Sequence, residues 1–252
     1  SLDVSGASAQ DTDGLQSRFI EYASIPAVTG TEHRLTAFIS QHLPNGMTAE
    51  TDNFGNVIVR YGEGDPELLV TAPLDEPGYI ISEIRDDGYM RVQPAGGRPH
   101  GLFHQLHEGR LVDIDTGEKI VHGVVSIPSS HISRGKGDRM PLDEFIIDVG
   151  AENRADIAAL GISELDVVSA VKDFAVLQNG RVAGPFLDTR FAGFALLEAV
   201  KAAAENAGGS VAVVWTTQNS RRNSGIMRLA QSMNPQRVIQ VTGFGRERIG
   251  RT

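Results

Sequence analysis

The sequence predicts an α/β fold, a sandwich built on a mixed sheet with a small β-barrel inserted into it. Helical and apolar strand-like segments alternate near both ends of the 252-residue chain. The continuous apolar run Leu68-Leu69-Val70-Thr71 is typical of a buried parallel strand. Between the ends, residues 79–175 hold short strands split by Gly and Asp turns. We therefore expect one α/β domain from residues 1–78 and 176–252, and an inserted β-barrel domain over 79–175.

The first 78 residues predict two helices followed by two strands. The helix over 12–24 has apolar residues at helical spacing and ends before Pro26, because a residue that precedes proline avoids the α conformation. A second apolar stripe predicts a helix over 35–43, which ends at Pro44-Asn45-Gly46. Short apolar runs predict strands at 57–59 and 68–71.

The middle and the end of the chain show two different patterns. The expected short strands of the insertion lie at 79–81, 89–92, 110–114, 121–125 and 145–150, and a helix is expected over 154–160. After residue 184 the α/β pattern returns, with helices over 191–204 and 226–233 and strands over 211–215 and 238–241. The first of these helices is apolar on most faces, which predicts that it is buried.

Composition excludes several classes of protein. The 23 Lys and Arg against 32 Asp and Glu give a net charge of −9, which argues against a nucleic-acid partner. No apolar run reaches the roughly 18–20 residues of a membrane span, so we expect no membrane partner. The absence of cysteine excludes disulfides, Cys-ligated zinc and thiol nucleophiles. The small, polar N-terminus lacks the features of an export signal, so the cytoplasm is the default location, with a cleaved signal still open.

Three polar segments are candidates for chemistry. Asp75 and Glu76 follow a predicted buried strand, where α/β folds bind ligands; they could act as acid, base or metal ligand, or simply form a solvated turn. Asp188 precedes a helix, and its pattern favours a helix cap over a ligand or a charge partner for Arg190. The loop from Thr217 to Asn223 carries no carboxylate, which favours a solvated loop over a binding loop.

Motifs in this order resemble a known family. The segments are Asp52-Asn53-Phe54-Gly55-Asn56, Ala72 to Gly78, Ile147 to Ala151, Leu187 to Arg190, and Thr217 to Gly225. Together they resemble the di-zinc metallo-aminopeptidases that include the glutamyl and the tetrahedral aminopeptidases, some of which carry an endoglucanase label. The resemblance implies a zinc-exopeptidase-like fold, two zinc or cobalt ions, a peptide ligand and self-association into a homo-oligomer.

The sequence departs from this family at the metal-binding positions. The resemblance places the family's first metal-binding histidine at Pro73, its general-base glutamate at Asn219 and the adjacent glutamate ligand at Ser220. A further aspartate ligand falls on Gln240, and the last histidine falls in a C-terminal segment that relatives have beyond Thr252. Four of these positions therefore have a residue that cannot replace the family's donor.

Two carboxylates of the family pattern are kept. Asp188 stands where the family has its bridging aspartate, and Asp75 stands where a carboxylate orients a metal ligand. One vestigial ligand does not hold zinc, which needs about three protein donors. We therefore expect a degenerate, C-terminally short member with no metal cofactor: a catalytically inactive pseudo-peptidase that binds a peptide or serves in an assembly.

Two alternative interpretations of the function remain open besides an inactive protein. One is a working aminopeptidase with relocated ligands, drawn from His100, His104 or His107. The other is metal-free hydrolysis with Ser220 as the nucleophile, which lacks a His or Lys base beside it in the sequence.

Overall fold

The computed structural model describes residues 9–95, 108–126, 145–203, 209–220 and 223–242. These residues fold as two compact units. Unit 1 comprises residues 1–27, 32–76 and 172–252, and unit 2 comprises 28–31 and 77–171. No described helix combines the length and the apolar character needed to cross a bilayer.

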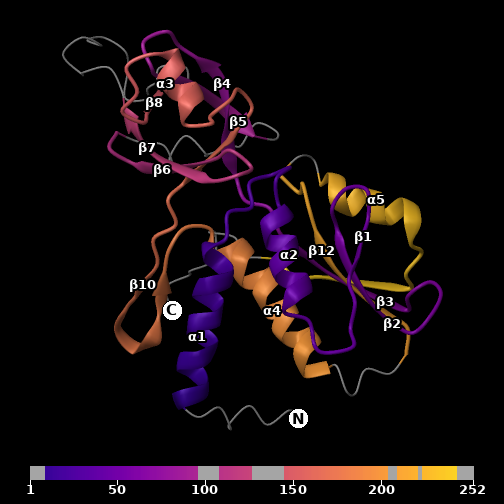
Figure 1. Cartoon of the computed structure of the whole chain (residues 1–252). Coiled ribbons are helices and arrows are strands. Elements are labelled where there is room, and N and C mark those ends of the chain that lie inside the picture. The colour runs from indigo at the N-terminus through magenta and orange to yellow at the C-terminus, as the bar shows by residue number, and fades with distance from the viewer. Residues whose placement is uncertain (1–8, 96–107, 127–144, 204–208, 221–222, 243–252) are drawn as a thin grey trace, which may run out of the picture. The chain divides into compact units, whose positions relative to one another are not determined.

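Unit 1 is a three-layer α/β structure (Figure 1). Its central sheet has the strand order β1-β2-β12-β3-β13; β3 pairs in parallel with β12 and β13, whereas β2 pairs antiparallel with β1 and β12. The sheet is therefore mixed, as the sequence predicts. Its elements are α1 (Ala9–Ser24), α2 (His33–Gln41), β1 (Glu50–Thr51), β2 (Val57–Tyr61), β3 (Leu68–Pro73), β10 (Ala175–Val176), a 3-10 turn (Gln178–Gly180), β11 (Val182–Ala183), α4 (Leu187–Ala203), β12 (Val211–Thr216), α5 (Ser224–Ser232) and β13 (Arg237–Gln240).

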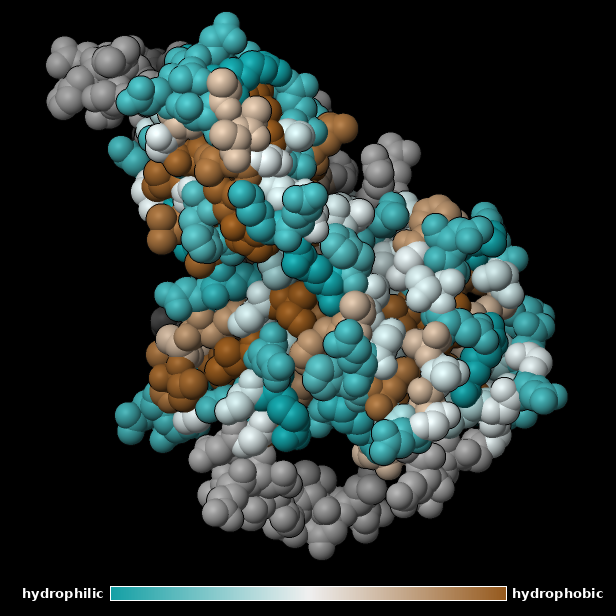
Figure 2. Space-filling model, viewed as in Figure 1, coloured by the Kyte–Doolittle hydropathy of each residue, from teal (hydrophilic) through white to brown (hydrophobic). Residues whose placement is uncertain are grey.

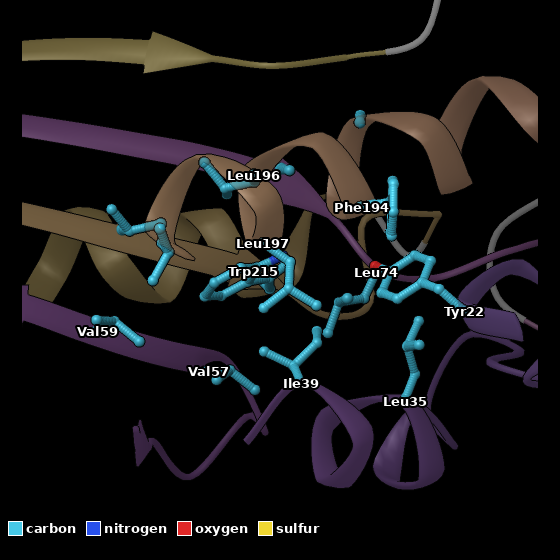
Figure 3. Close-up of a cluster of buried hydrophobic side chains, with 14 of the residues drawn as sticks. Tyr22, Leu35, Ile39, Val57, Val59, Leu74, Phe194, Leu196, Leu197 and Trp215 are labelled. Carbon is cyan, nitrogen blue, oxygen red and sulfur yellow. The ribbon is translucent and has the colours of Figure 1, made fainter. Parts of the chain in front are cut away.

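Apolar side chains fill both spaces between the sheet and its helices. On one face, α1, α2 and α4 pack against β2, β3 and β12 around the fully buried Trp215 (Figure 3). The indole N–H of Trp215 donates to the carbonyl of Gly193 in α4 at 2.9 Å, so this large side chain is buried with its polar atom satisfied. On the other face, Leu229 of α5 and the following Met233 pack against Ile58, Leu69 and Val214.

Unit 2 contains a closed six-stranded barrel, which confirms the β-barrel predicted from the short strands. The strand order is β4-β5-β8-β7-β6-β9, and every neighbouring pair is antiparallel. Alternate residues point into an apolar interior that includes Ile81, Met90, Ile114 and Ile147. Its elements are β4 (Gly78–Ile84), β5 (Met90–Ala95), β6 (Leu111–Asp115), β7 (Ile120–Ser126), β8 (Ile146–Asp148), α3 (Arg154–Ala159) and β9 (Val167–Ala170).

One buried hydroxyl in the central sheet predicts a stabilising substitution. Thr71 of β3 is fully buried, and its hydroxyl has no hydrogen-bond partner within the described part of the chain. Thr71→Val removes an unsatisfied polar group at nearly constant shape, so we expect it to stabilise the fold by about 1 kcal/mol and to raise Tm by about 2–4 °C in thermal unfolding.

Thr216 provides the matched control for this prediction. It is equally buried, but its Oγ1 lies 3.0 Å from Asn219 Oδ1 and 3.3 Å from the carbonyl of Ala72. Thr216→Val should therefore lower Tm. A Thr71→Val variant that melts at or below the wild-type temperature would contradict the prediction.

Candidate functional site

The parallel strands β3 and β12 bring two of the predicted polar segments together. Thr216 lies opposite Pro73 in the register, so both strands end at the same edge of the sheet. Leu74 to Glu76 follows β3, and Thr217 to Ser220 follows β12. Loops at the carboxyl ends of neighbouring parallel strands form the usual ligand site of such sheets.

Asp75 joins these two loops through both carboxylate oxygens. Oδ1 accepts hydrogen bonds from the backbone N–H and from the side-chain amide of Asn219, each at 2.8 Å, and Oδ2 accepts one from the backbone N–H of Ser220 at 2.8 Å. Asp75 is 3% exposed, so the interpretation of this segment as a solvated turn is wrong. The carboxylate holds the loop after β12 in place.

Asn219 uses its whole amide group within this loop. Its Nδ2 donates to Asp75 and, at 2.7 Å, to the carbonyl of Thr216, and its Oδ1 accepts from the Thr216 hydroxyl at 3.0 Å. An amide has no basic atom that could take a proton from water. The arrangement therefore orders the loop and supplies no general base.

Two residues to which the sequence analysis gave no role anchor the same loop. Oε1 of the buried Glu32, next to α2, accepts the backbone N–H of Gln218 at 2.8 Å. The fully buried Asn56 accepts the N–H of Thr217 at 2.9 Å and donates to the carbonyl of Gly225 at 3.1 Å. The first residues of the loop are thus tied to their surroundings through the backbone, whereas Ser220 and Asn223 are exposed to solvent. Asn56 closes a recognisable Asp-x-x-x-Asn turn, whereas nothing in the sequence marks Glu32.

Glu76 lies in a buried cluster of charges. Its Oε2 pairs with the guanidinium of Arg190 and with Lys172 Nζ at 2.6 Å, and none of the three side chains is more than 4% exposed. Lys172 also donates to the carbonyl of Ile25 at 2.8 Å, and Arg190 donates to that of Leu74 at 3.3 Å.

The two cations determine the protonation of Glu76. Burial alone would raise the pKa of Glu76, but the charges and hydrogen bonds of Arg190 and Lys172 outweigh it and hold the pKa below its ordinary value. Glu76 is therefore a charged anchor that joins the loop after β3 to α4. Arg190 pairs with Glu76, which corrects the alternative that Asp188 is its charge partner.

Asp188 lies in the first turn of α4, inside the helix, so the expectation of a cap preceding the helix is wrong. Its negative charge there still stabilises the helix, because it lies near the partial positive charge at the helix N-terminus. It lines an open pocket of about 490 Å³ together with Phe19, Val182, Leu187 and Phe191. Apolar residues gather over α1 and β10 on this side of unit 1 (Figure 2). The surroundings of Asp188 are therefore mostly apolar.

The remaining predicted positions contribute little to a metal site. Pro73 ends β3 and has no donor atom, Ser220 is exposed and contacts Asp75 through its backbone, and Gln240 is exposed on β13 opposite Thr71. The three histidines of the alternative reading, His100, His104 and His107, lie outside the described residues.

A binuclear metal centre does not fit the donor set seen here. In the described ranges, no group of three or more His, Cys, Asp or Glu side chains is placed to hold a metal ion. Both oxygens of Asp75 already accept N–H groups, and the Asn219 amide is fully bonded. A zinc site needs about three protein ligands, and among the positions named above Asp188 offers one.

Comparisons with known proteins give a consistent result. Residues 55–243 match the family described as M42 glutamyl aminopeptidase. A lysyl aminopeptidase of Pyrococcus furiosus is 30% identical over 187 residues, which cover 72% of this chain and 53% of the relative. The chain thus spans about half the length of this curated relative.

Solved structures support the same fold. The TET1 peptidase of Pyrococcus horikoshii, whose assembly is described as a tetrahedron or a large octahedral shell, matches with a TM-score of 0.79 and 29% identity, over 92% of this chain and 68% of that one. A Thermotoga maritima protein labelled endoglucanase matches with a TM-score of 0.66 and 25% identity, over 88% and 64% of the two chains. The family match covers most of the sequence, and the chain belongs to the M42 glutamyl aminopeptidase family.

Proposed function

We propose that this protein is a catalytically inactive member of its family, which binds a peptide or takes part in an assembly. The observation that carries the proposal is the state of Asn219. The resemblance puts the general base at this position, yet the residue is an amide whose atoms bond Asp75 and Thr216. General-base catalysis is worth roughly 10²–10⁴-fold in rate, and this group cannot supply it.

The hydrogen bonds of the loops around Asn219 support a protein that keeps the family fold but uses it for binding rather than catalysis. The Asn219 amide bonds the Asp75 carboxylate, where a second carboxylate would repel it. The Asp75 carboxylate and the N–H groups of Asn219 and Ser220 satisfy each other, so this hydrogen bonding does not depend on a metal ion. This local order supports a protein that keeps the family fold for binding.

The pocket beside Asp188 supports a peptide ligand. Within the described chain, the Asp188 carboxylate has no hydrogen-bond or ion-pair partner, and the other pocket residues are apolar. A carboxylate next to an apolar surface complements an ammonium group attached to an apolar side chain. The N-terminus of a peptide has this chemistry, and the curated relative of Pyrococcus furiosus named above is a lysyl aminopeptidase.

Self-association is the second part of the proposal. The TET1 peptidase is described as a large closed assembly, and the present chain matches it over 92% of its length. We therefore propose a homo-oligomer for this chain as well.

Metal content and turnover test the proposal. The purified protein, incubated with zinc or cobalt and then desalted, should retain no stoichiometric metal by elemental analysis. It should not hydrolyse leucine, lysine or glutamate p-nitroanilide above the rate of a buffer blank. Both results follow because the positions of the family's donors hold Pro73, Asn219, Ser220 and Gln240.

A restored variant provides the control for this test. Pro73→His, Asn219→Glu, Ser220→Glu and Gln240→Asp, combined in one chain, should bind zinc more tightly than the wild type because Pro73→His, Ser220→Glu and Gln240→Asp add three metal ligands, while Asn219→Glu returns the general base. Stoichiometric metal with turnover in the wild type would refute the proposal. If substitution of His100, His104 or His107 then removed that activity, the relocated-ligand reading would replace it.

A further inference from the structure

Buried charges mark the places where the chain enters and leaves unit 1. The chain passes between the two units after residues 27, 31, 76 and 171, so the residues of unit 1 at these boundaries are Ala27, Glu32, Glu76 and Lys172. The side chains of Glu76 and Lys172 are buried, and so is Glu32. Because charged side chains are rarely buried unless they are paired, the partners of these three show what each boundary is attached to.

Three of the four boundaries meet at the Glu76 carboxylate. Its Oε1 accepts the backbone N–H of Ala27 at 3.2 Å, and the backbone N–H of Glu76 donates to the carbonyl of Ala27 at 2.9 Å. Its Oε2 pairs with Lys172 Nζ at 2.6 Å and with the guanidinium of Arg190 in α4. One side chain therefore joins the segments through which the chain first leaves unit 1, leaves it again and finally returns.

Lys172 strengthens the same connection from the returning segment. Its Nζ donates to the carbonyl of Ile25 at 2.8 Å and to that of Ala23, near the end of α1, at 3.3 Å. An ammonium group has three N–H donors, and these two carbonyls and the Glu76 carboxylate match that number. The segment from Ala23 to Ala27 is thus held both by Lys172 and by Glu76.

The remaining boundary, and the residue before Glu76, connect to the loop after β12. Glu32 Oε1 accepts the backbone N–H of Gln218 at 2.8 Å. Asp75 accepts the backbone N–H groups of Asn219 and Ser220, each at 2.8 Å. Because Asp75 directly precedes Glu76 in the chain, a displacement of the Glu76 backbone also moves the acceptor of these two N–H groups.

Backbone strain makes this loop sensitive to the loss of its contacts. Gln218 has a φ of 52°, a left-handed conformation that is uncommon for a residue other than glycine. Such a conformation persists only where the surroundings impose it, and here the Gln218 N–H is held by Glu32. A loop released from these contacts would therefore relax rather than stay in place.

We propose that these boundary contacts open and close as one conformational unit, which couples the boundaries of unit 1 to the loop after β12. In the closed state, the contacts of Glu32, Glu76 and Lys172 are those described above. In the open state, the boundary segments and the loop lose them together, while the central sheet stays folded. A ligand that binds the closed loop would shift the equilibrium towards closed boundaries. This coupling goes beyond the proposed function and does not depend on whether the protein is catalytically inactive.

Native-state hydrogen exchange of the wild-type chain tests whether these contacts open together. At urea concentrations below the unfolding transition, the amides of Ala27, Glu76, Gln218 and Asn219 should exchange through one common opening. They should therefore show the same free energy of opening and the same dependence on urea. Both quantities should be smaller than those measured for amides in β12, which report global unfolding.

Lys172→Met tests whether a change at a boundary reaches the loop. The substitution removes the ammonium group and keeps an unbranched side chain, and Glu76 retains Arg190, so we expect the variant to fold. Exchange at Ala27 should accelerate at least roughly tenfold, because hydrogen bonds to charged groups are lost. Exchange at Gln218 should accelerate by the same factor, although its N–H bonds Glu32 rather than Lys172.

Two further variants complete the test. Coupling between two sites is reciprocal, so Glu32→Ala, which removes the acceptor of the Gln218 N–H, should accelerate exchange at Ala27 and Glu76 as well. Lys201→Met is the matched control, because Lys201 also pairs with a glutamate, Glu198 at 2.8 Å, but is partly exposed. It should leave exchange at the boundaries and in the loop unchanged.

The inference fails if the wild-type amides at the boundaries and in the loop open independently, or if they exchange only through global unfolding. It also fails if Lys172→Met accelerates exchange at Ala27 and leaves Gln218 at the wild-type rate. The wild-type experiment decides the question even if a variant does not fold. These readouts are separate from metal content and turnover, so either proposal can fail without the other.

Discussion

Glu76→Gln is expected to lower the free energy of unfolding by about 3–5 kcal/mol, since it leaves two buried cations without their carboxylate. Arg190 and Lys172 are 0% and 4% exposed, and water cannot take the place of Glu76 around them. The loss should appear as a lower urea midpoint at neutral pH with an unchanged slope.

The pH dependence of the same variant provides an independent check. The pKa of Glu76 in the folded protein lies below its ordinary value, so its contribution is complete above that ordinary pKa and is lost as the pH falls through the folded pKa. The stability difference between wild type and Glu76→Gln should therefore narrow only in acid, below about pH 4.

Glu198→Gln is the matched control for Glu76→Gln. Glu198 also contacts two cations, Arg18 at 3.1 Å and Lys201 at 2.8 Å, but these side chains are partly exposed. Glu198→Gln should lower the free energy of unfolding by at most about 1 kcal/mol. Equal effects of the two substitutions would show that burial of the Glu76 cluster does not determine its importance.

Asp75→Asn is expected to destabilise the protein by about 2–4 kcal/mol and to loosen the loop after β12. The wild-type carboxylate accepts three hydrogen bonds from Asn219 and Ser220. An asparagine side chain has one acceptor oxygen, and its NH₂ group would face an N–H donor. Hydrogen exchange at the amides of Asn219 and Ser220 should therefore accelerate well before global unfolding.

An exposed aspartate tests whether charge alone explains the effect. Asp65 is exposed and receives one long hydrogen bond, from the N–H of Asn234 at 3.4 Å. Asp65→Asn removes the same charge and should change stability by less than about 0.5 kcal/mol. An Asp75→Asn variant with wild-type exchange rates at Asn219 and Ser220 would show that the carboxylate does not order this loop.

The sequence predicts the burial of polar residues less well than any other feature of the fold. Asp75, Glu76 and Thr217 occur in segments rich in turn-forming residues, which favoured solvated loops. In the structure they are at most 3% exposed because β3 and β12 end side by side and their loops contact each other. Local composition reports the backbone preference of a segment but not the partners that other segments bring to it.

Asp188 illustrates the same limit at a helix terminus. A helix beginning near Phe191 made Asp188 a candidate cap, but α4 begins at Leu187 and includes Asp188 in its first turn. Helix ends depend on tertiary contacts of the first turn, and those of Arg190 with Glu76 and Leu74 extend this helix towards its N-terminus.

The sequence by itself determined the α/β class, the parallel strand at 68–71, the inserted β-barrel and the family, because each depends on hydrophobic periodicity or on motif order along the chain. Only the tertiary structure decided that Asp75 and Asn219 bond each other and that Glu76 pairs with both Arg190 and Lys172. These features join residues more than 90 positions apart or depend on which strands lie side by side, and a linear pattern carries no information about such pairing.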